Sequence, residues 1–559
     1  MVKRLLKLFH YEFSGLHNAA LVLALSSSVS ALLGLFRDRL LAGTFGAGES
    51  LDIYYAAFKI PDLIYNAISL SLVSITALIP FFLEKISTSS ENGRKYLNDI
   101  FSVFFGAMAA VSAAAFFTVP FLIDLVAPGF SSEAKHQLVF LSRLLLVTPF
   151  IQGLSNLLAV IVQSFNRFFI YASSLIVYNI GIIFGIVFLS RGMGTKGIVL
   201  GVVVGAFFQV LIQIPSCLKL GFLPKLKLKI NFSDVIKTMK LAFPRTIGLG
   251  LNQLLMIFIT AFASFLSAGS IAIFNLSYNL QYVPLTVIGL SYSTAAFPTL
   301  ARLFVNNQKE KFLEYTIIAM RQIIFWSIPA TVLFVVLRAQ IVRVIYGYGQ
   351  FDWRDTRLTA AALGLFSVSV AGQAIILLLT RAFFAAGKTK KPIMINAISS
   401  VFVIAGIFAL MQAINLSAAG RFLFGKILRV GDIGDMEILI LPFVFSIGMI
   451  ANSILLVKSF QKEFGEIWLS VKDTFFQVVI ASFLMGAVTY MSLSVLDRIF
   501  DIKTFIGIFF QGFVSAVFGA GFWHVALTAA KNKELIEITD SLKQKFWKSP
   551  VIASEREEL

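Results

Sequence analysis

Residues 31–62, which read ALLGLFRDRLLAGTFGAGESLDIYYAAFKIPD, decide the fold. An apolar run ends in a charged cluster that includes Arg37 and Asp38, and a second run begins at Asp52 and carries Lys59. A charge at membrane depth costs roughly 2.5–3.5 kcal/mol on insertion scales, so it persists only where it faces a wet cavity or another charge. The stretch therefore predicts two membrane spans joined by a short turn, and it marks this hairpin as the functional site.

The composition extends this interpretation to the whole chain. Of 559 residues, 58% are hydrophobic and 14% are charged, and the mean hydropathy is +0.86. Apolar runs of about twenty residues are long enough to cross a bilayer as helices. Because about fourteen such runs follow one another, we expect an all-α integral membrane protein with about fourteen transmembrane helices.

Several kinds of chemistry lack residues to support them. Cys217 is the only cysteine, which excludes an intramolecular disulfide, and the four histidines are scattered without metal-ligand spacing. No stretch resembles a catalytic triad or a nucleotide-binding loop. We therefore expect a protein that is not an enzyme and has no cofactor. The sequence leaves a metal or coupling ion undetermined.

The net charge of +18 follows the expected membrane topology. When the N-terminus is placed in the cytoplasm, the inside regions hold roughly twice as many Lys and Arg residues as the outside loops. This bias predicts that both termini are cytoplasmic. It also accounts for the basic charge without nucleic-acid binding.

An internal repeat divides the chain. Three anchors recur at an offset of 221 residues: Ala47-Gly48 as Ala268-Gly269, Phe130 as Phe351, and Gln152 as Gln373. Six spans in each repeat keep the same orientation, which predicts two lobes around a substrate cavity that opens by alternating access. The predicted domains are an N-terminal interfacial segment (1–18), an N-lobe of helices 1–6 (19–225), a C-lobe of helices 7–12 (226–460) with an amphipathic or ordinary outside loop (415–435), helices 13 and 14 (461–530) and a cytoplasmic tail (531–559).

Charged residues within the expected spans are candidates for substrate binding. Arg37 presents a planar fork of donors that suits a phosphate, and Asp38 or Asp52 is expected to pair with it. The same three residues also fit a charged helix end at the outer interface. Lys59 and Arg245 either face the cavity or extend to the membrane surface.

Motifs along the chain resemble those of a known family. They are Gly34-Leu35-Phe36-Arg37-Asp38, Phe45-Gly46-Ala47-Gly48, Ala57-Phe58-Lys59-Ile60-Pro61, Ala127-Pro128-Gly129-Phe130, Asn166-Arg167-Phe168, Ala263-Ser264-Phe265-Leu266, Tyr348-Gly349-Gln350-Phe351 and Arg381-Ala382-Phe383. In order and spacing they resemble the MurJ (MviN) family of lipid II flippases, within the multidrug/oligosaccharidyl-lipid/polysaccharide exporter superfamily. The resemblance implies a role in peptidoglycan synthesis and fourteen helices, of which two lie outside the lobes and form a groove for a polyprenyl tail.

The sequence departs from this family at several cavity arginines. Their positions hold Ala31, Tyr65, Asn66 and Asn279. The charged residues that remain are Arg37, Asp38, Asp52 and Lys59, and Arg245 is a possible substitute for a lost arginine. An uncharged set on spans seven and eight either lines a hydrated cavity or joins helices by hydrogen bonds: Asn252, Gln253, Asn275, Asn279 and Gln281.

Three hypotheses follow. The first is a monomeric flippase that moves a polyprenyl-diphosphate-linked, lipid II-like cell-wall precursor from the inner to the outer leaflet of the bacterial cytoplasmic membrane. Its substrate-binding residues would be Arg37, Asp38, Asp52, Lys59, Arg245 and Asn279. The second is a transporter of another lipid-linked polysaccharide or amphiphile, which the missing arginines favour. The third is a membrane scaffold that has lost transport and has a collapsed interior.

The topology gives a direct test. We expect a cysteine at Lys227, in a chain whose Cys217 is replaced by serine, to react with a membrane-impermeant thiol reagent only after the cells are opened, because the loop 219–240 is rich in lysine. A cysteine at Lys426, in the expected outside loop, is the control that reacts in intact cells. Labelling of the Lys227 position in intact cells would refute the topology.

Overall fold

The computed structural model describes residues 16–416, 425–426, 431, 433 and 435–547, and within them it leaves out the side chains of residues 16–28, 76, 241, 243–245, 414–416 and 541–547. Every regular element in this part of the chain is a helix. Most of the predicted segments 1–18 and 415–435 and the end of the tail 531–559 lie outside the described residues.

The number of membrane spans agrees with the sequence. Twelve of the described helices or helix runs are long and apolar enough to cross a membrane, and α19 with α20, bent by 45°, makes a thirteenth if the pair is one span. The first expected span falls in α2, a helix of 30 residues. The all-α, multi-pass architecture is thereby confirmed.

The chain divides into two compact units, which we describe separately. Unit 1 comprises residues 1–276, 345–359 and 396–441, and unit 2 comprises residues 277–344, 360–395 and 442–559. This division follows contacts in space, and the lobes 19–225 and 226–460 remain a prediction.

The helices of unit 1 follow one another with short connections. They are α2 (Leu16–Phe45), α3 (Glu49–Ala57), α4 (Lys59–Ile64), η1 (Tyr65–Ser69), α5 (Leu70–Leu72), α6 (Ile75–Thr88), α7 (Ser90–Val126), α8 (Ser132–Leu145), α9 (Val147–Ser164), α10 (Phe168–Phe184), η2 (Gly185–Leu189), α11 (Ser190–Met193), α12 (Thr195–Leu211), α13 (Ile214–Leu220), α14 (Phe232–Ala263), η4 (Met436–Leu439) and the start of α15 (Ser270–Pro284).

The remaining helices belong to unit 2 or pass between the units. They are η3 (Leu285–Leu290), α16 (Ser291–Val305), α17 (Lys309–Val336), α18 (Arg338–Tyr346), α19 (Trp353–Ser367), α20 (Val370–Ala385), α21 (Lys390–Leu416), α23 (Ile440–Phe464), α24 (Trp468–Leu496), α25 (Phe505–Ala529) and α26 (Lys533–Trp547).

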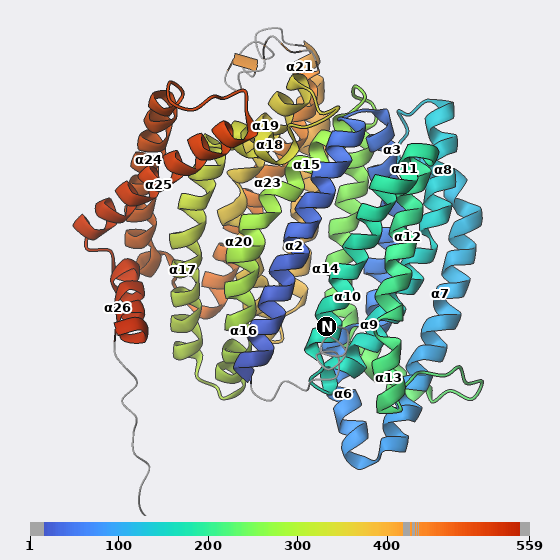
Figure 1. Cartoon of the computed structure of the whole chain (residues 1–559). Coiled ribbons are helices and arrows are strands. Elements are labelled where there is room, and N and C mark those ends of the chain that lie inside the picture. Colours follow the sequence, from blue (N-terminus) through green and yellow to red (C-terminus); the bar gives the residue numbers. More distant parts are fainter. Residues whose placement is uncertain (1–15, 417–424, 427–430, 432, 434, 548–559) are drawn as a thin grey trace, which may run out of the picture. The chain divides into compact units, whose positions relative to one another are not determined.

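Small residues allow close helix packing in unit 1. α10 and α12 run side by side (Figure 1). A Cβ atom added to Gly181 would lie 2.2 Å from the Cα atom of Gly205, so the two backbones touch at this point. Glycine and other small residues serve this purpose in membrane helices, where close van der Waals packing replaces the hydrophobic effect.

In unit 2, α24 packs against both α17 and α25 (Figure 1). Phe325 of α17 and Trp523 of α25 pack together in the core of this group, with ring centroids 5.0 Å apart and ring planes at 55°. The C-terminal α26 is attached to it through the buried carboxylate of Glu534, which lies 2.7 Å from the guanidinium of Arg321 and accepts a hydrogen bond from Thr474.

The internal repeat is visible in the helix boundaries. α3 begins at Glu49 and α15 at Ser270, while α8 begins at Ser132 and α19 at Trp353, each pair 221 residues apart. A π-helical segment interrupts the span that begins with α3, as η1, and the equivalent span that begins with α15, as η3. π-helical turns are rare, so their recurrence at nearly the same place supports the repeat. A third such segment, η2, has no counterpart, because the equivalent part of α21 is α-helical.

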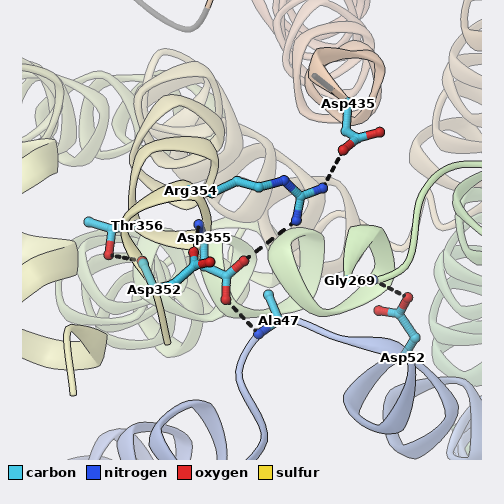
Figure 2. A network of polar contacts seen from close by, with 8 residues as sticks. All are labelled: Ala47, Asp52, Gly269, Asp352, Arg354, Asp355, Thr356 and Asp435. Carbon is cyan, nitrogen blue, oxygen red and sulfur yellow. Dashed lines mark hydrogen bonds and ion pairs between the residues drawn. The ribbon is translucent and has the colours of Figure 1, made fainter. Parts of the chain in front are cut away.

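A buried carboxylate joins the starts of the two equivalent helices. Asp52 in α3 is 3% exposed, and its two oxygens accept hydrogen bonds from the backbone N–H groups of Gly269 and Ala272, both at 2.7 Å. The first N–H groups of a helix have no partner within it, and the helix dipole favours a negative charge there. Asp52 therefore caps α15 from a different span (Figure 2).

Three further contacts lie beside this cap. The backbone N–H of Ala47 donates to Asp355, whose own helix begins after Asp352 (Figure 2). The N–H of Gly129 donates to the Ser264 hydroxyl at 3.0 Å, and that of Gln350 donates to the Gly43 carbonyl at 2.8 Å. The last two contacts are counterparts at the 221-residue offset. We call these residues the inter-repeat junction: Gly43, Ala47, Asp52, Gly129, Ser264, Gly269, Ala272, Gln350 and Asp355.

Gly269 tests how tightly the junction is packed. Its φ of +93° is strained for other residues, and a Cβ atom there would lie 2.0 Å from the Ala47 carbonyl oxygen. We expect Gly269→Ala to lower the thermal unfolding midpoint of the purified protein, since backbone strain of this kind costs on the order of 1–3 kcal/mol before the clash is added. Gly248→Ala is the control, because open space surrounds Gly248 within α14. Equal midpoints for the two variants would contradict the tight junction.

Candidate functional site

The ion pair expected in the first span is present. The guanidinium of Arg37 in α2 donates to Asp38 Oδ1 from Nε at 2.9 Å and from Nη2 at 2.8 Å. Its third nitrogen lies 3.4 Å from Asn179 Oδ1 in α10. Asp38 is 2% exposed, while a quarter of the Arg37 side chain remains accessible. The pair is therefore neutral overall but leaves part of the guanidinium open to a ligand.

Asp52 differs from its expected position. We expected Asp38 or Asp52 to pair with Arg37. Asp38 is the partner, and both oxygens of Asp52 instead accept backbone hydrogen bonds at the start of α15. From the sequence, the nearby cations were the evident partners for Asp52. The true partners could not be anticipated, because the helix start that Asp52 caps lies 217 residues further along the chain. A part for Asp52 in substrate binding stays a prediction.

Lys59 lies at the start of α4 and is 7% exposed. Its ammonium group donates to Asn275 Oδ1 in α15 at 3.4 Å, and Gln253 of α14 donates to the Lys59 carbonyl at 3.4 Å. One member of the uncharged polar set thus contacts the ammonium group, and a second contacts the backbone of the same residue. Because a buried ammonium needs polar partners, the contact with Asn275 helps to hold the charge within a candidate membrane span.

The structure says less about the other two predicted residues. Arg245 lies within α14, and its side chain is outside the described part of the chain. Asn279 is half-buried in α15, one turn beyond Asn275, and belongs to unit 2. Gln281 accepts a hydrogen bond from Gln373 at 3.2 Å, which is a contact between helices. The roles of Arg245 and Asn279 in substrate binding remain predictions.

Unit 1 also holds a polar cavity of about 360 Å³. It is lined by residues of η1, α5, α6, α9, α10 and α14: Tyr65, Leu70, Ser74, Ile75, Asn156, Gln163, Tyr171, Ala242, Thr246 and Leu249. Tyr65 was expected here only as the replacement of a family arginine. Asn156 and Gln163 were not predicted, although their spacing of seven residues places two amides on one face of an apolar helix.

The polar groups of this cavity are connected. Asn156 Nδ2 donates to the Tyr65 hydroxyl at 2.9 Å, which links α9 to η1. The hydroxyl of Ser71 donates to Thr246 Oγ1 at 2.9 Å and links α5 to α14. Within the described residues, no group of three or more His, Cys, Asp or Glu side chains is placed to hold a metal ion.

Comparison with known proteins agrees with this arrangement. The family model described as lipid II flippase MurJ matches residues 41–511. A probable lipid II flippase MurJ from Buchnera aphidicola (subsp. Acyrthosiphon pisum) is 30% identical over 374 residues, which cover 66% of this chain and 73% of the relative. The corresponding protein of Vibrio cholerae is 26% identical over 424 residues, covering 73% of this chain and 78% of the relative.

Solved structures share the fold. A lipid II flippase MurJ in an inward closed conformation superposes with a TM-score of 0.70 at 22% identity, covering 92% of this chain and all of that one. An inward-facing multidrug resistance transporter of the MATE family, in the MOP superfamily, gives 0.61 at 13% identity, covering 78% of this chain and 94% of the other. Since the family match extends over well more than half of the sequence, this chain belongs to the lipid II flippase MurJ family.

Proposed function

We propose that this protein moves lipid II, or a closely similar polyprenyl-diphosphate-linked glycan, from the inner to the outer leaflet of the bacterial cytoplasmic membrane. One observation carries the proposal beyond family membership: candidate spans of the chain hold a buried cation and line a cavity whose wall carries hydroxyl and amide groups. Polar groups inside a membrane are costly, and they are characteristic of a route for a polar cargo. Both termini would be cytoplasmic, and the protein would act as a monomer.

The residues have distinct roles in this proposal. The accessible part of Arg37 and the ammonium of Lys59 bind the diphosphate, because charge-assisted hydrogen bonds are strongest with phosphate oxygens. Asp38 holds the Arg37 guanidinium in a fixed orientation. Arg245 adds a further cation, and the uncharged apolar tail of the cargo stays in lipid or against α24 and α25.

The inter-repeat junction is the part of the protein that would open and close during alternating access. Its hydrogen bonds join equivalent ends of the two repeats, so they separate when that end opens and re-form when it closes. Transport through such a cycle can be driven by the membrane potential, since moving one charge is worth about 2.3 kcal/mol per 100 mV.

A second function has some support. The described residues that line the cavity carry no formal charge, which favours a less anionic lipid-linked glycan as cargo. A scaffold that has lost transport stays the third alternative, because the cavity expected to distinguish a flippase from it is one faced by Arg37 and Lys59, and the cavity in unit 1 is lined by neither residue.

Complementation tests the proposed function. We expect the wild-type gene to support growth of a bacterium whose own lipid II flippase is switched off. A chain that reaches the membrane in normal amount but fails to support growth contradicts lipid II as the cargo. Rescue by the same gene of a strain that lacks the transporter of a different lipid-linked glycan would then identify the second function.

Lys59 should be required for transport. Lys59→Met retains the apolar stem but removes the charge, and loss of one charge-assisted hydrogen bond should weaken binding of a diphosphate lipid by roughly ten- to a hundred-fold. The matched control is Lys135→Met, because Lys135 forms its 2.8 Å ion pair with Asp124 at the protein surface. Binding and flipping are measured in liposomes with equal amounts of folded protein. An identical response of the two variants would exclude a role for Lys59.

Two positions in the second repeat, Arg245 and Asn279, allow opposite tests, since one change should impair transport and the other should strengthen binding. Arg245→Ala should impair transport, whereas Asn279→Arg should strengthen binding of a diphosphate lipid about ten-fold, since a guanidinium grips two phosphate oxygens. Affinity for polyprenyl diphosphate is the measurement. If neither change, nor Lys59→Met, alters this affinity, the cargo is not a diphosphate and the second function takes precedence.

A further inference from the structure

The cavity in unit 1 has the chemistry of a site for neutral hydroxyl-rich groups. Its described polar lining consists of the hydroxyls of Tyr65, Tyr171, Ser74 and Thr246 and the amides of Asn156 and Gln163. Hydroxyls and primary amides each combine donors with acceptors. Sugars present the same mixture, and each of their hydroxyls can pair with either kind of group.

The shape of the lining agrees with this chemistry. Asn156 and Gln163 lie two turns apart along α9, which separates them by about 10 Å. Tyr65 and Tyr171 contribute aromatic faces from two different helices. An aromatic ring offers an apolar surface beside its hydroxyl, and the C–H face of a sugar ring packs on such a surface while its hydroxyls reach the amides. The volume of about 360 Å³ is within the range of small-molecule sites.

The same lining is poorly suited to a phosphate. Phosphates are held by Arg, Lys or the N-terminal N–H groups of helices, and none of the described lining side chains is Arg or Lys. The Tyr65 hydroxyl is oriented by the 2.9 Å hydrogen bond from Asn156 and, as a phenol, can donate to a ligand while it accepts.

We propose that this cavity is a glycan subsite, which binds the uncharged sugar part of the cargo separately from the cations that bind its diphosphate. This assignment rests on the proposed function for the identity of the cargo as a lipid-linked glycan. It goes beyond that function because it gives sugar recognition to Tyr65, Asn156, Gln163 and Tyr171, and diphosphate recognition to other residues.

Two probes separate the subsites. The first is an alkyl glycoside of an N-acetylated disaccharide, which has the sugars without the diphosphate, and the second is polyprenyl diphosphate, which has no sugar. Binding of each to the full-length protein in nanodiscs is measured by calorimetry. We expect Asn156→Leu and Tyr65→Phe each to weaken glycoside binding roughly three- to ten-fold, the effect of one lost hydrogen bond, and to leave diphosphate binding unchanged.

Tyr96→Phe is the matched control. It removes a 2.9 Å tyrosine hydrogen bond, to Thr238, in the same unit but outside the cavity lining. The proposal is overturned if the glycoside does not bind, if its affinity is the same in the wild type and both cavity variants, or if Tyr96→Phe weakens it equally.

The two proposals fail in different ways. If the protein flips lipid II but the cavity variants leave glycoside binding unchanged, the glycan subsite is wrong and the proposed function stands. Cavity-dependent glycoside binding by a protein that does not flip lipid II would retain the subsite and indicate another lipid-linked glycan as cargo.

Discussion

The two oxygens of Asp52 accept hydrogen bonds from the first N–H groups of α15, and much of unit 1 depends on this contact. A carboxylate that is 3% exposed would be destabilising without such donors. α3 and α15 both begin at this point, so the cap also fixes where their later residues meet. Lys59, seven residues after Asp52, lies beside Asn275, which is three residues after Ala272. The position of the buried cation therefore follows from the cap.

The repeat was predictable from the sequence because equivalent residues recur at a constant spacing. The anchors Ala47-Gly48 and Ala268-Gly269 were chosen only for their offset, and in the structure the two anchors meet, since Gly269 packs directly against the Ala47 carbonyl. Neighbouring residues such as Arg37 and Asp38 were also paired correctly, since adjacent charges can meet without knowledge of the fold.

The cap and the cavity depend on packing between distant segments. The partners of Asp52 lie about 220 residues further along the chain, and an isolated carboxylate gives no sign that it faces a helix start instead of a cation. The cavity joins residues of six helical segments, none of which contributes more than two polar groups. A single tyrosine or glutamine in an apolar helix has many ordinary explanations, so its function becomes apparent only when the helices are assembled.

The π-helical segments η1 and η3 set the register of the helix that follows each of them. A π-turn holds one more residue than the α-turn it replaces, and the two segments begin at Tyr65 and Leu285, at nearly the same place in each repeat. The spacing between the repeats is 221 residues both before the segments, at Glu49 and Ser270, and after them, at Ser132 and Trp353. Deletion of one residue from η1 alone would turn the helix that follows it by about 100° about its axis and would carry Leu70 away from the cavity that it lines.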